Sequence, residues 1–450
     1  MSKKLLFFML AALLLFSIQV SAQDDVMEMD EVVVTASRYE ESIMDTPVSI
    51  EVIDEEEIEE SNANNLADLL ELAGGVYIKD NGSLMAKKDV TIRGYTESRI
   101  IILLDGQPYS SPNDGEISLE AIPVELIKRI EVLKSPGSAI YGPNAMGGVI
   151  NIITKDGEDI EKTKIKAGLG SYNKRNLNIS RSFRNEQSSI IFVYDSLNSD
   201  GHRANSEIDR DDLFIKTKLK TGEISTLNLS LKYNETNLEF PGSDLGDPSG
   251  AKIEEELNLN AFLIQNFENK DRRISIFTTD RDTLIPYVGD SNSQIDIKRT
   301  GLNIRETNYI NNHILNYGFE IISDESVNIY NTPSFGSTNY DENNLNKSIF
   351  IEDKYSINKE NIINIGIRYD DHEEYGSELS PRLGYLYRIN KYLNFNLLYG
   401  ESYKAPSYFQ LYFPDWGGGN PDLIPETTKS YEVGLKYNRS NCSRQIKKKK

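Results

Sequence analysis

The stretch Leu227-Asn228-Leu229-Ser230-Leu231-Lys232-Tyr233 decides the fold class, because its apolar and polar side chains alternate strictly. Period two places the two sets of side chains on opposite faces of a β-strand. The same alternation recurs between residues 162 and 437, for example at 363–369 and 393–399. About 14 such segments, each about 8–12 residues long and separated by Asn, Asp, Gly and Ser loops, indicate a large antiparallel sheet.

A soluble antiparallel sandwich and a transmembrane β-barrel both show this alternation. The polar row here carries full charges at Lys232, Arg382, Arg388 and Lys436, which suits a water-filled lumen. In several segments the apolar row ends in tyrosine, as aromatic residues at a membrane interface would. We therefore predict a membrane all-β fold, with an antiparallel transmembrane β-barrel over residues 160–438.

Composition excludes several other classes. The 450 residues include 49 Lys and Arg against 70 Asp and Glu, a formal net charge of -21, so the chain offers no basic surface for nucleic acid. The single cysteine, Cys442, excludes an internal disulfide, and three histidines offer little for a metal site. After residue 22 no run approaches the roughly 20 apolar residues of a membrane-spanning helix.

The N-terminus has the pattern of a secretory signal peptide. Lys3 and Lys4 precede an apolar run over residues 5–20, and the small residues Ser21 and Ala22 follow it. A basic start, an apolar centre and a small-residue cleavage site together predict a signal peptide over residues 1–22. The mature chain is then expected to be exported and to begin near residue 23.

Residues 41–155 differ from the barrel region and predict a compact α/β unit. Alternation over residues 48–52 predicts a strand. Ser61 is expected to cap a helix whose leucines, between residues 66 and 72, share one face. An amphipathic segment at 124–130, preceded by a proline, predicts a short helix.

Residues 23–40 form an acidic leader that contains a β-branched run at 30–36. Such a run near a free terminus can add itself to the exposed edge of a partner's sheet through main-chain hydrogen bonds. It can equally be the first strand of the α/β unit. The residues alone leave both interpretations open.

Two further patches stand out. The α/β unit ends in Gly147-Gly148-Val149-Ile150-Asn151-Ile152-Ile153-Thr154, and its glycines fit neither a phosphate loop nor a dinucleotide fingerprint. Residues 403–427 are rich in Pro, Gly and Trp and lie between two alternating segments, which predicts a long, structured external loop.

In this order, after a signal peptide, these patches resemble those of a TonB-dependent outer-membrane receptor of the siderophore and vitamin B12 type. Residues 41–155 are similar to the family's plug domain, and residues 403–427 to its late-barrel motif. The TonB box is matched by Asp30, Glu31, Val32, Val33, Val34, Thr35 and Ala36. The resemblance implies an N-terminal α/β plug in the barrel lumen, in the outer membrane of a Gram-negative bacterium.

The resemblance also implies active import of a scarce chelate. TonB, with its inner-membrane energising complex, would bind residues 30–36 and use the proton gradient to pull. An iron–siderophore complex is the first expectation, and cobalamin is the alternative. The remaining partners are outer-membrane lipid and the barrel assembly machinery; we expect a monomer with no nucleic acid, no cofactor, no metal site and no covalent chemistry.

Ligand contacts are expected on the plug apices and in the external loop. The candidates are Asn81, Tyr95, Tyr109, Ser110, Asn113, Tyr408 and Trp416. Heme receptors of the family typically carry a histidine between the halves of the late-barrel motif, and residues 407–419 contain none, which disfavours heme. His372 lies among four acidic residues at 370–374. Residues of these types can bind a cation, but such a cluster is more often part of a solvated loop.

The strand number departs from the family. The family's barrels have about 22 strands, whereas this sequence supplies about 14. Residues 439–450 form a basic tail without alternation and without the terminal aromatic residue that such barrels usually carry. Because an unclosed sheet in lipid leaves main-chain groups unpaired, we expect a truncated receptor rather than a smaller closed barrel.

Two competing functions place different demands on the sequence. A passive porin or adhesin would need neither the run at 30–36 nor an internal plug. An exported enzyme would need a catalytic constellation, and the sequence has no nucleophile elbow, no H-E-x-x-H and no Cys/His pair. We therefore expect a transporter and not an enzyme.

Overall fold

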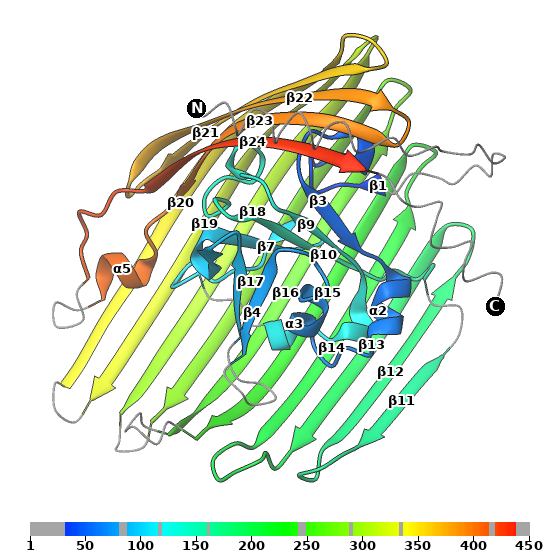
Figure 1. Cartoon of the computed structure of the whole chain (residues 1–450). Coiled ribbons are helices and arrows are strands. Elements are labelled where there is room, and N and C mark those ends of the chain that lie inside the picture. The colour runs from blue at the N-terminus through cyan, green and yellow to red at the C-terminus, as the bar shows by residue number, and fades with distance from the viewer. Residues whose placement is uncertain are drawn as a thin grey trace, which may run out of the picture. The chain divides into compact units, whose positions relative to one another are not determined.

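The computed structural model describes residues 32–80, 88–115, 119–159, 163–241, 249–287, 291–332, 336–413 and 419–437. They belong to one compact unit that begins at Val32. The expected signal peptide, Asp30, Glu31 and the basic tail lie outside the described residues. The described part consists of a small α/β region and one large sheet (Figure 1).

The α/β region is built on a five-stranded mixed sheet in the order β3-β9-β10-β7-β8. Its strands are β3 (Ile50–Ile53), β7 (Ile100–Leu104), β8 (Gln107–Pro108), β9 (Ile127–Leu133) and β10 (Gly148–Thr154). The central strand β10 runs parallel to β7 and antiparallel to β9. Both faces of β7 and β10 are buried, which explains why these strands are almost continuously apolar rather than alternating.

Two smaller sheets complete the region. One contains β4 (Val76–Asp80), β5 (Lys88–Ile92) and β6 (Tyr95–Thr96), and the other pairs β1 (Val32–Val33) with β2 (Glu41–Ser42). The short helices are η1 (Ile43–Asp45), α2 (Glu55–Ser61), α3 (Leu66–Leu70), η2 (Glu97–Arg99), η3 (Leu119–Ala121), η4 (Val124–Leu126) and α4 (Ser138–Tyr141). None of the helices in the described ranges is long and apolar enough to cross a membrane.

The helix starts differ from those expected. Ser61 does not cap α3 but is the last residue of α2, which begins with a capping box between Asp54 and Glu57. Asn65 caps α3 instead, through a side-chain bond to the amide of Asp68. Aspartate and asparagine are at least as good N-caps as serine, so the sequence offered competing signals within a few residues.

The expected helix over residues 124–130 is also mostly wrong. Only η4 forms, and β9 begins at Ile127. Ile127 and Ile130 are fully buried in the main core, where β9 pairs with both β3 and β10. Tertiary pairing therefore overrides the local amphipathic pattern.

The main core lies between the five-stranded sheet and α3. Leu66, Leu69 and Leu70 project from one helix face, as their spacing predicted, and none of them is exposed to solvent. They pack in one cluster with strand residues such as Ile102 and Ile150. This cluster gives the region a hydrophobic core of its own.

Gly148 is required where β10 begins. Its φ is 143°, and a Cβ there would lie 2.2 Å from the main-chain oxygen of Leu133. We expect Gly148→Ala to destabilise the α/β region by about 3 kcal/mol, because strain and overlap add. The measurement is the urea concentration at which trypsin starts to cleave this region.

Gly106→Ala is the matched control. Gly106 also has a positive φ, 83°, but no atom lies within 4 Å of its added Cβ, so only about 1 kcal/mol of strain is expected. Equal urea dependence of the two variants would contradict the close approach at Gly148.

The large sheet has 14 strands, each antiparallel to its sequence neighbours, in the order β11 to β24. They are β11 (Lys164–Leu169), β12 (Arg175–Arg184), β13 (Ser188–Ser199), β14 (Ile208–Lys220), β15 (Ser225–Phe240), β16 (Gly250–Asn266), β17 (Lys270–Pro286), β18 (Asn292–Ile310), β19 (His313–Thr332), β20 (Gly336–Ser356), β21 (Asn361–His372), β22 (Gly376–Asn390), β23 (Leu393–Lys404) and β24 (Glu426–Tyr437). The predicted strand number is confirmed. We call this sheet the wall.

The two faces of the wall have the polarity of a membrane barrel. On the face toward the α/β region, Lys232 and Glu256 are 2% and 1% exposed. On the opposite face, Ile349 and Ile365 are each 58% exposed. A soluble sandwich would bury its apolar row between two sheets, whereas this wall turns that row outward, as a lipid-facing strand does. The predicted choice of barrel over sandwich is confirmed.

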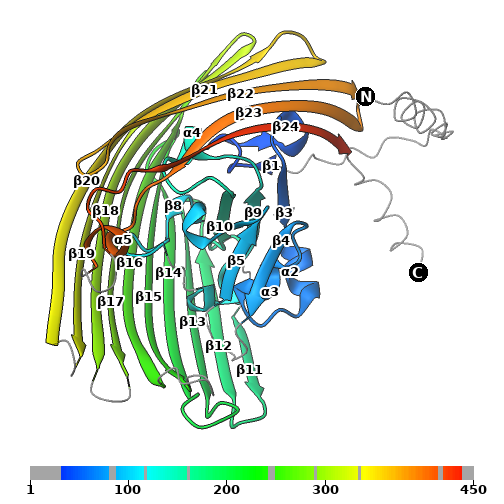
Figure 2. The same cartoon turned by 60° about the vertical axis from the view of Figure 1, so that its left-hand side comes forward.

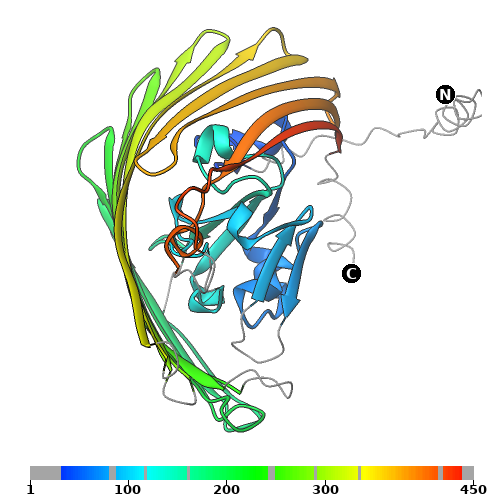
Figure 3. The ribbon, with the colours of Figure 1, turned by 90° about the vertical axis from the view of Figure 1, so that its left-hand side faces the viewer.

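The wall curves around the α/β region, which lies on its concave face (Figures 2 and 3). Within the described ranges the sheet is not closed, because β11 pairs only with β12 and β24 only with β23. Side chains of the last strand are consequently exposed, with Tyr431 at 78% and Val433 at 75%.

Candidate functional site

The first feature of functional interest is the N-terminal segment, which we define as residues 32–38. Val32 and Val33 form β1, antiparallel to Ser42 and Glu41. Val33 and Thr35 are fully buried, and Ala36 is 1% exposed. In this structure Val32 and Val33, within the run that resembles a TonB box, thus form a short first strand of the α/β region, with Val33 buried and Val32 42% exposed.

One carboxylate holds the segment from the side of the α/β region. Glu131 Oε2 on β9 accepts hydrogen bonds from the amides of Val34 and Thr35, at 2.9 and 2.8 Å, and from Thr35 Oγ1 at 2.7 Å. Arg129 holds the other carboxylate oxygen at 2.8 Å. Glu131 is itself fully buried, so these bonds lie in a dry environment, where an unpaired partner is costly.

The wall holds the same segment from the other side. Arg382 Nη1 donates to the carbonyl of Ala36 at 3.3 Å, and Asn316 Nδ2 donates to the carbonyl of Ser37 at 2.9 Å. Several main-chain groups that could join a partner's sheet are therefore already bonded. Pairing with another strand requires that the segment first leave this position.

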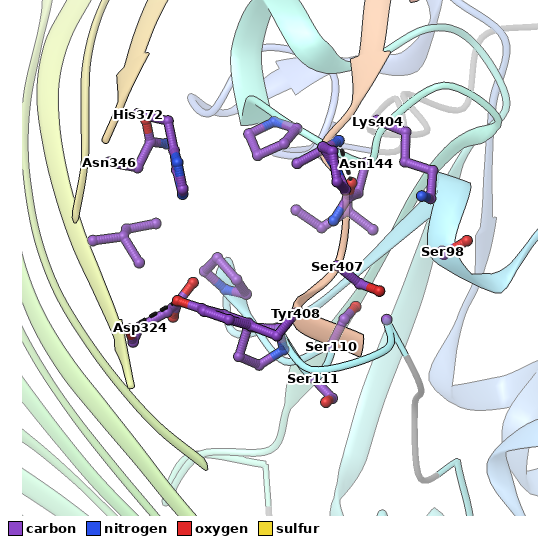
Figure 4. A pocket seen from close by; sticks show the side chains of 18 of the residues that line it. Ser98, Ser110, Ser111, Asn144, Asp324, Asn346, His372, Lys404, Ser407 and Tyr408 are labelled. Atoms are coloured by element: carbon purple, nitrogen blue, oxygen red, sulfur yellow. Dashed lines mark hydrogen bonds between the residues drawn. The ribbon is translucent and has the colours of Figure 1, made fainter. Parts of the chain in front are cut away.

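The second feature is a cavity of about 100 Å³, which we call the loop-side cavity. It lies toward the long connections of the wall, between the α/β region, the wall and the segment around α5 (Tyr408–Tyr412) (Figure 4). Its polar lining includes Ser98, Ser110, Ser111, Asn144, Arg299, Asp324, Asn346, His372, Lys404, Ser407 and Tyr408. Ordinary ligand pockets have about 300–1,000 Å³, so a large chelate requires movement of this lining.

Hydrogen bonds fix the cavity's floor to the wall. Arg299 forms a two-pronged ion pair with Asp324, with Nε–Oδ1 at 2.6 Å and Nη2–Oδ2 at 2.8 Å, and donates to the carbonyl of Ser110 at 3.0 Å. The Tyr408 hydroxyl donates to the main-chain oxygen of Asp324 at 2.9 Å, as Figure 4 shows. Bidentate arginine pairs combine strength with fixed geometry, so this floor is preorganised.

The structure brings two of the expected contact residues together at this cavity, Ser110 and Tyr408. Tyr109 instead is 2% exposed and donates to Glu256 Oε1 at 2.9 Å, within a buried group that also holds Lys232 and Arg281. Its role there is to anchor the loop after β8 to the wall.

Tyr95 and Asn113, two more of the expected contacts, lie apart from the cavity lining. Tyr95 bonds through its hydroxyl to Thr428 Oγ1 at 3.2 Å on β24. Asn113 is 2% exposed and accepts a bond from the amide of Phe409 at 2.9 Å. Asn81 and Trp416 lie outside the described residues.

Sequence reasoning missed Arg299 and Asp324, which lie within long alternating strands that give no local signal. It singled out His372, but for a cation site. His372 lines the loop-side cavity and stacks on Tyr375, with ring centroids 4.0 Å apart. Within the described ranges, no group of three or more His, Cys, Asp or Glu side chains is placed to hold a metal ion.

Comparison with known families agrees with this architecture. Residues 42–149 match the TonB-dependent receptor plug domain, and residues 159–443 match the TonB-dependent receptor-like β-barrel. The first match contains the five-stranded sheet except for most of β10, and the second contains the whole wall.

Individual relatives point to the same group. The chain is 28% identical over 454 residues to the vitamin B12 transporter BtuB of Vibrio vulnificus strain YJ016, covering 97% of this chain and 72% of the relative. It is also 28% identical over 468 residues to the iron-regulated outer membrane virulence protein of Vibrio cholerae serotype O1, covering 94% and 68%.

Solved structures share the fold. The ferripyoverdine receptor of the outer membrane of Pseudomonas aeruginosa superposes with a TM-score of 0.77 at 15% identity, covering 91% of this chain but only 63% of the receptor. This chain therefore spans less than two thirds of that protein. The two family matches together cover most of the sequence. They agree with an α/β region surrounded by a wall whose apolar face points outward. The chain therefore belongs to the TonB-dependent receptor family.

Proposed function

We propose that the protein imports a scarce chelate across the outer membrane of a Gram-negative bacterium, driven by TonB acting on residues 30–36. The observation that carries this proposal is the position of the N-terminal segment, held between the α/β region and the wall by Glu131, Arg382 and Asn316. A porin or adhesin gains nothing from such an attachment. Through this attachment, a force applied to the segment from the periplasmic side acts on the α/β region.

The proposed ligand is an iron–siderophore complex, and the alternative is cobalamin. The name of the Vibrio cholerae relative, an iron-regulated outer membrane protein, supports the first. The vitamin B12 transporters among the relatives support the second. In either case the ligand is proposed to bind between the external loops and the plug, above the loop-side cavity.

The deciding experiment is uptake in a host that lacks its own siderophore receptors and cobalamin transporter. The host expresses this chain and receives radiolabelled ferric siderophores or radiolabelled cobalamin. We expect accumulation of one class when TonB is present and none when TonB is deleted. Accumulation that is independent of TonB would favour a passive porin and contradict the proposal.

Tyr408→Ala is expected to weaken binding of the imported ligand by about tenfold, because it removes an aromatic side chain from the cavity floor and one bond to Asp324. Equilibrium binding to purified receptor measures this. Phe409→Ala is the matched control, since Phe409 lies on the same helix but is 41% exposed and packs against Phe413, with ring centroids 4.2 Å apart. An equal loss of ligand affinity in both variants would show that Tyr408 does not contribute to the binding site.

A further inference from the structure

A second cavity lies between the α/β region and the wall, with a volume of about 360 Å³. Several wall residues that line it, such as Lys218, Thr226 and Asn266, lie next to short turns at strand ends. Short turns mark the periplasmic end of outer-membrane barrels. We call this cavity the turn-side cavity.

The charge of its lining is opposite to that of the chain. Acidic residues exceed basic ones by 70 to 49 in the whole sequence. The described lining of the turn-side cavity has seven basic residues, Arg38, Lys128, Arg129, Lys216, Lys218, Arg273 and Arg305, against four acidic ones, Glu40, Asp105, Asp156 and Glu320. A concentration of positive charge inside a strongly acidic protein favours anions at this place.

Five of the seven basic side chains have a carboxylate partner. Examples are Lys216 with Asp105 at 3.0 Å and Arg38 with Glu320 at 3.4 Å. These pairs neutralise one another and leave little net attraction for a ligand. The other three partnered cations are Lys128, Arg129 and Lys218.

Arg273 and Arg305 differ from the rest. Among the described residues, the Arg273 guanidinium donates only to the main-chain oxygen of Asp105 at 3.4 Å and to Ser275 Oγ at 3.2 Å, and it lies 3.8 Å from the Phe262 ring centroid. The guanidinium of Arg305 makes no hydrogen bond or ion pair to a residue in the described ranges. Both are partly buried, on adjacent strands β17 and β18, at directly opposed positions.

The acidic groups near these two arginines already have other partners. Asp105 attracts Arg273, but it already pairs with Lys216 at 3.0 Å. Asp271 attracts Arg305, but it accepts a hydrogen bond from the Tyr309 hydroxyl at 2.7 Å. Arg38 repels both guanidinium groups. Glu320 already pairs with Arg38 and, at 2.8 Å, with Arg368. Burial raises the pKa of Tyr141 to about 12, so its hydroxyl stays uncharged at neutral pH.

We propose that Arg273 and Arg305 form an oxyanion site, and that a carboxylate or phosphate group of the cargo occupies it during passage to the periplasm. Two planar guanidinium groups with free donors match the geometry of such an anion. The two guanidinium groups, which lack a carboxylate partner among the described residues, become paired when the anion binds, and this makes binding favourable despite their partial burial.

The position of the site fits a passage, a role that rests on the proposed import function. Tyr141 and Glu320 line both the loop-side and the turn-side cavity, so one thin partition separates them. Arg38 completes this partition, with its guanidinium 4.7 Å from the Tyr141 ring centroid and an ion pair to Glu320. Because Arg38 ends the N-terminal segment, withdrawal of that segment removes Arg38 from the partition.

The binding test uses the purified full chain in detergent, titrated calorimetrically with citrate and with inorganic phosphate at constant ionic strength. We expect saturable binding that weakens by about tenfold or more in R273Q/R305Q. R272Q is the matched control, because Arg272 is the neighbouring arginine on the opposite face and pairs with Glu306 at 2.7 Å. R305K retains the charge but not the planar fork, so it is expected to bind the anion more weakly than the wild type and more tightly than R305Q.

No saturable binding by the wild type, or equal weakening in R272Q, would overturn the site. Circular dichroism and trypsin resistance verify that each variant is folded. This arm needs neither TonB nor a known cargo, so its outcome is independent of the proposed import function.

The uptake arm tests whether the anion belongs to the cargo. Cells import an iron chelate with free carboxylates or an iron chelate without them. R273Q/R305Q is expected to slow the first and leave the second unchanged. If anion binding is lost but both chelates enter at wild-type rates, the site holds a free periplasmic anion and the passage role is wrong.

Discussion

Glu131→Ala is expected to release the N-terminal segment and to raise the rate of trypsin cleavage after Arg38 by about 100-fold. The variant removes three hydrogen bonds to one buried carboxylate oxygen, from Val34 N, Thr35 N and Thr35 Oγ1. Hydrogen bonds to charged groups contribute about 1.5–3 kcal/mol each. A loss of roughly 3 kcal/mol in total, after partial compensation by water, shifts the equilibrium about 100-fold.

Mass spectrometry of fragments that begin at Tyr39 measures this cleavage. Glu131→Gln keeps the size and one acceptor and is expected to give about a tenfold increase, because it exchanges charged for neutral hydrogen bonds. Glu51→Ala is the matched control on neighbouring β3, where the carboxylate pairs with Lys134 at 2.5 Å and, within the described ranges, forms no hydrogen bond or ion pair to residues 32–38. Cleavage of Glu131→Ala at the wild-type rate would show that Glu131 does not hold the segment.

Val33→Pro is expected to reduce TonB-dependent uptake to background while ligand binding remains. Proline has no amide hydrogen and interrupts the main-chain ladder that an added strand forms with its partner. Such a ladder depends on the main chain and largely tolerates changes in side chains. Cell-surface binding and accumulation of radiolabelled ligand are the two measurements.

Val33→Ala is the control for the lost side chain. Val33 is fully buried in a cluster with Ile140 and Tyr141, so both substitutions weaken packing in the resting position, but only proline blocks strand addition. Uptake by Val33→Pro equal to that of Val33→Ala would refute the assignment of residues 30–36.

The double variant Glu131→Ala/Val33→Pro separates release from pairing. Its segment is expected to be as accessible to trypsin as in Glu131→Ala, because the carboxylate is gone. Its uptake is expected to stay at background, because the ladder cannot form. Restored uptake in the double variant would mean that release alone is the limiting step.

The wall was predictable because its two environments alternate with the pleat. Along most strands a polar side chain toward the α/β region, such as Lys232, alternates with an apolar side chain on the opposite face, such as Leu231, and a period-two pattern detects this difference. The α/β region was less predictable. Its strands are buried on both faces, and its helices are too short for a periodicity of 3.6 to fix their ends.

The position of the N-terminal segment was beyond local reasoning. Thr35 and Glu131 are 96 residues apart, and no local sequence pattern around either residue predicts their contact. The β-branched run favours an extended chain whether its partner is β2 or another protein, because strand propensity does not specify a partner. The same limit applies to Tyr109, whose partner Glu256 is 147 residues away.

The most direct test of this account is amide hydrogen exchange at Val34 and Thr35 in the full chain. The hydrogen bonds to Glu131 predict slow exchange in the wild type, at least about 100-fold slower than for an unprotected amide, and near-unprotected exchange in Glu131→Ala. Unprotected exchange at both amides in the folded wild type would contradict the held segment.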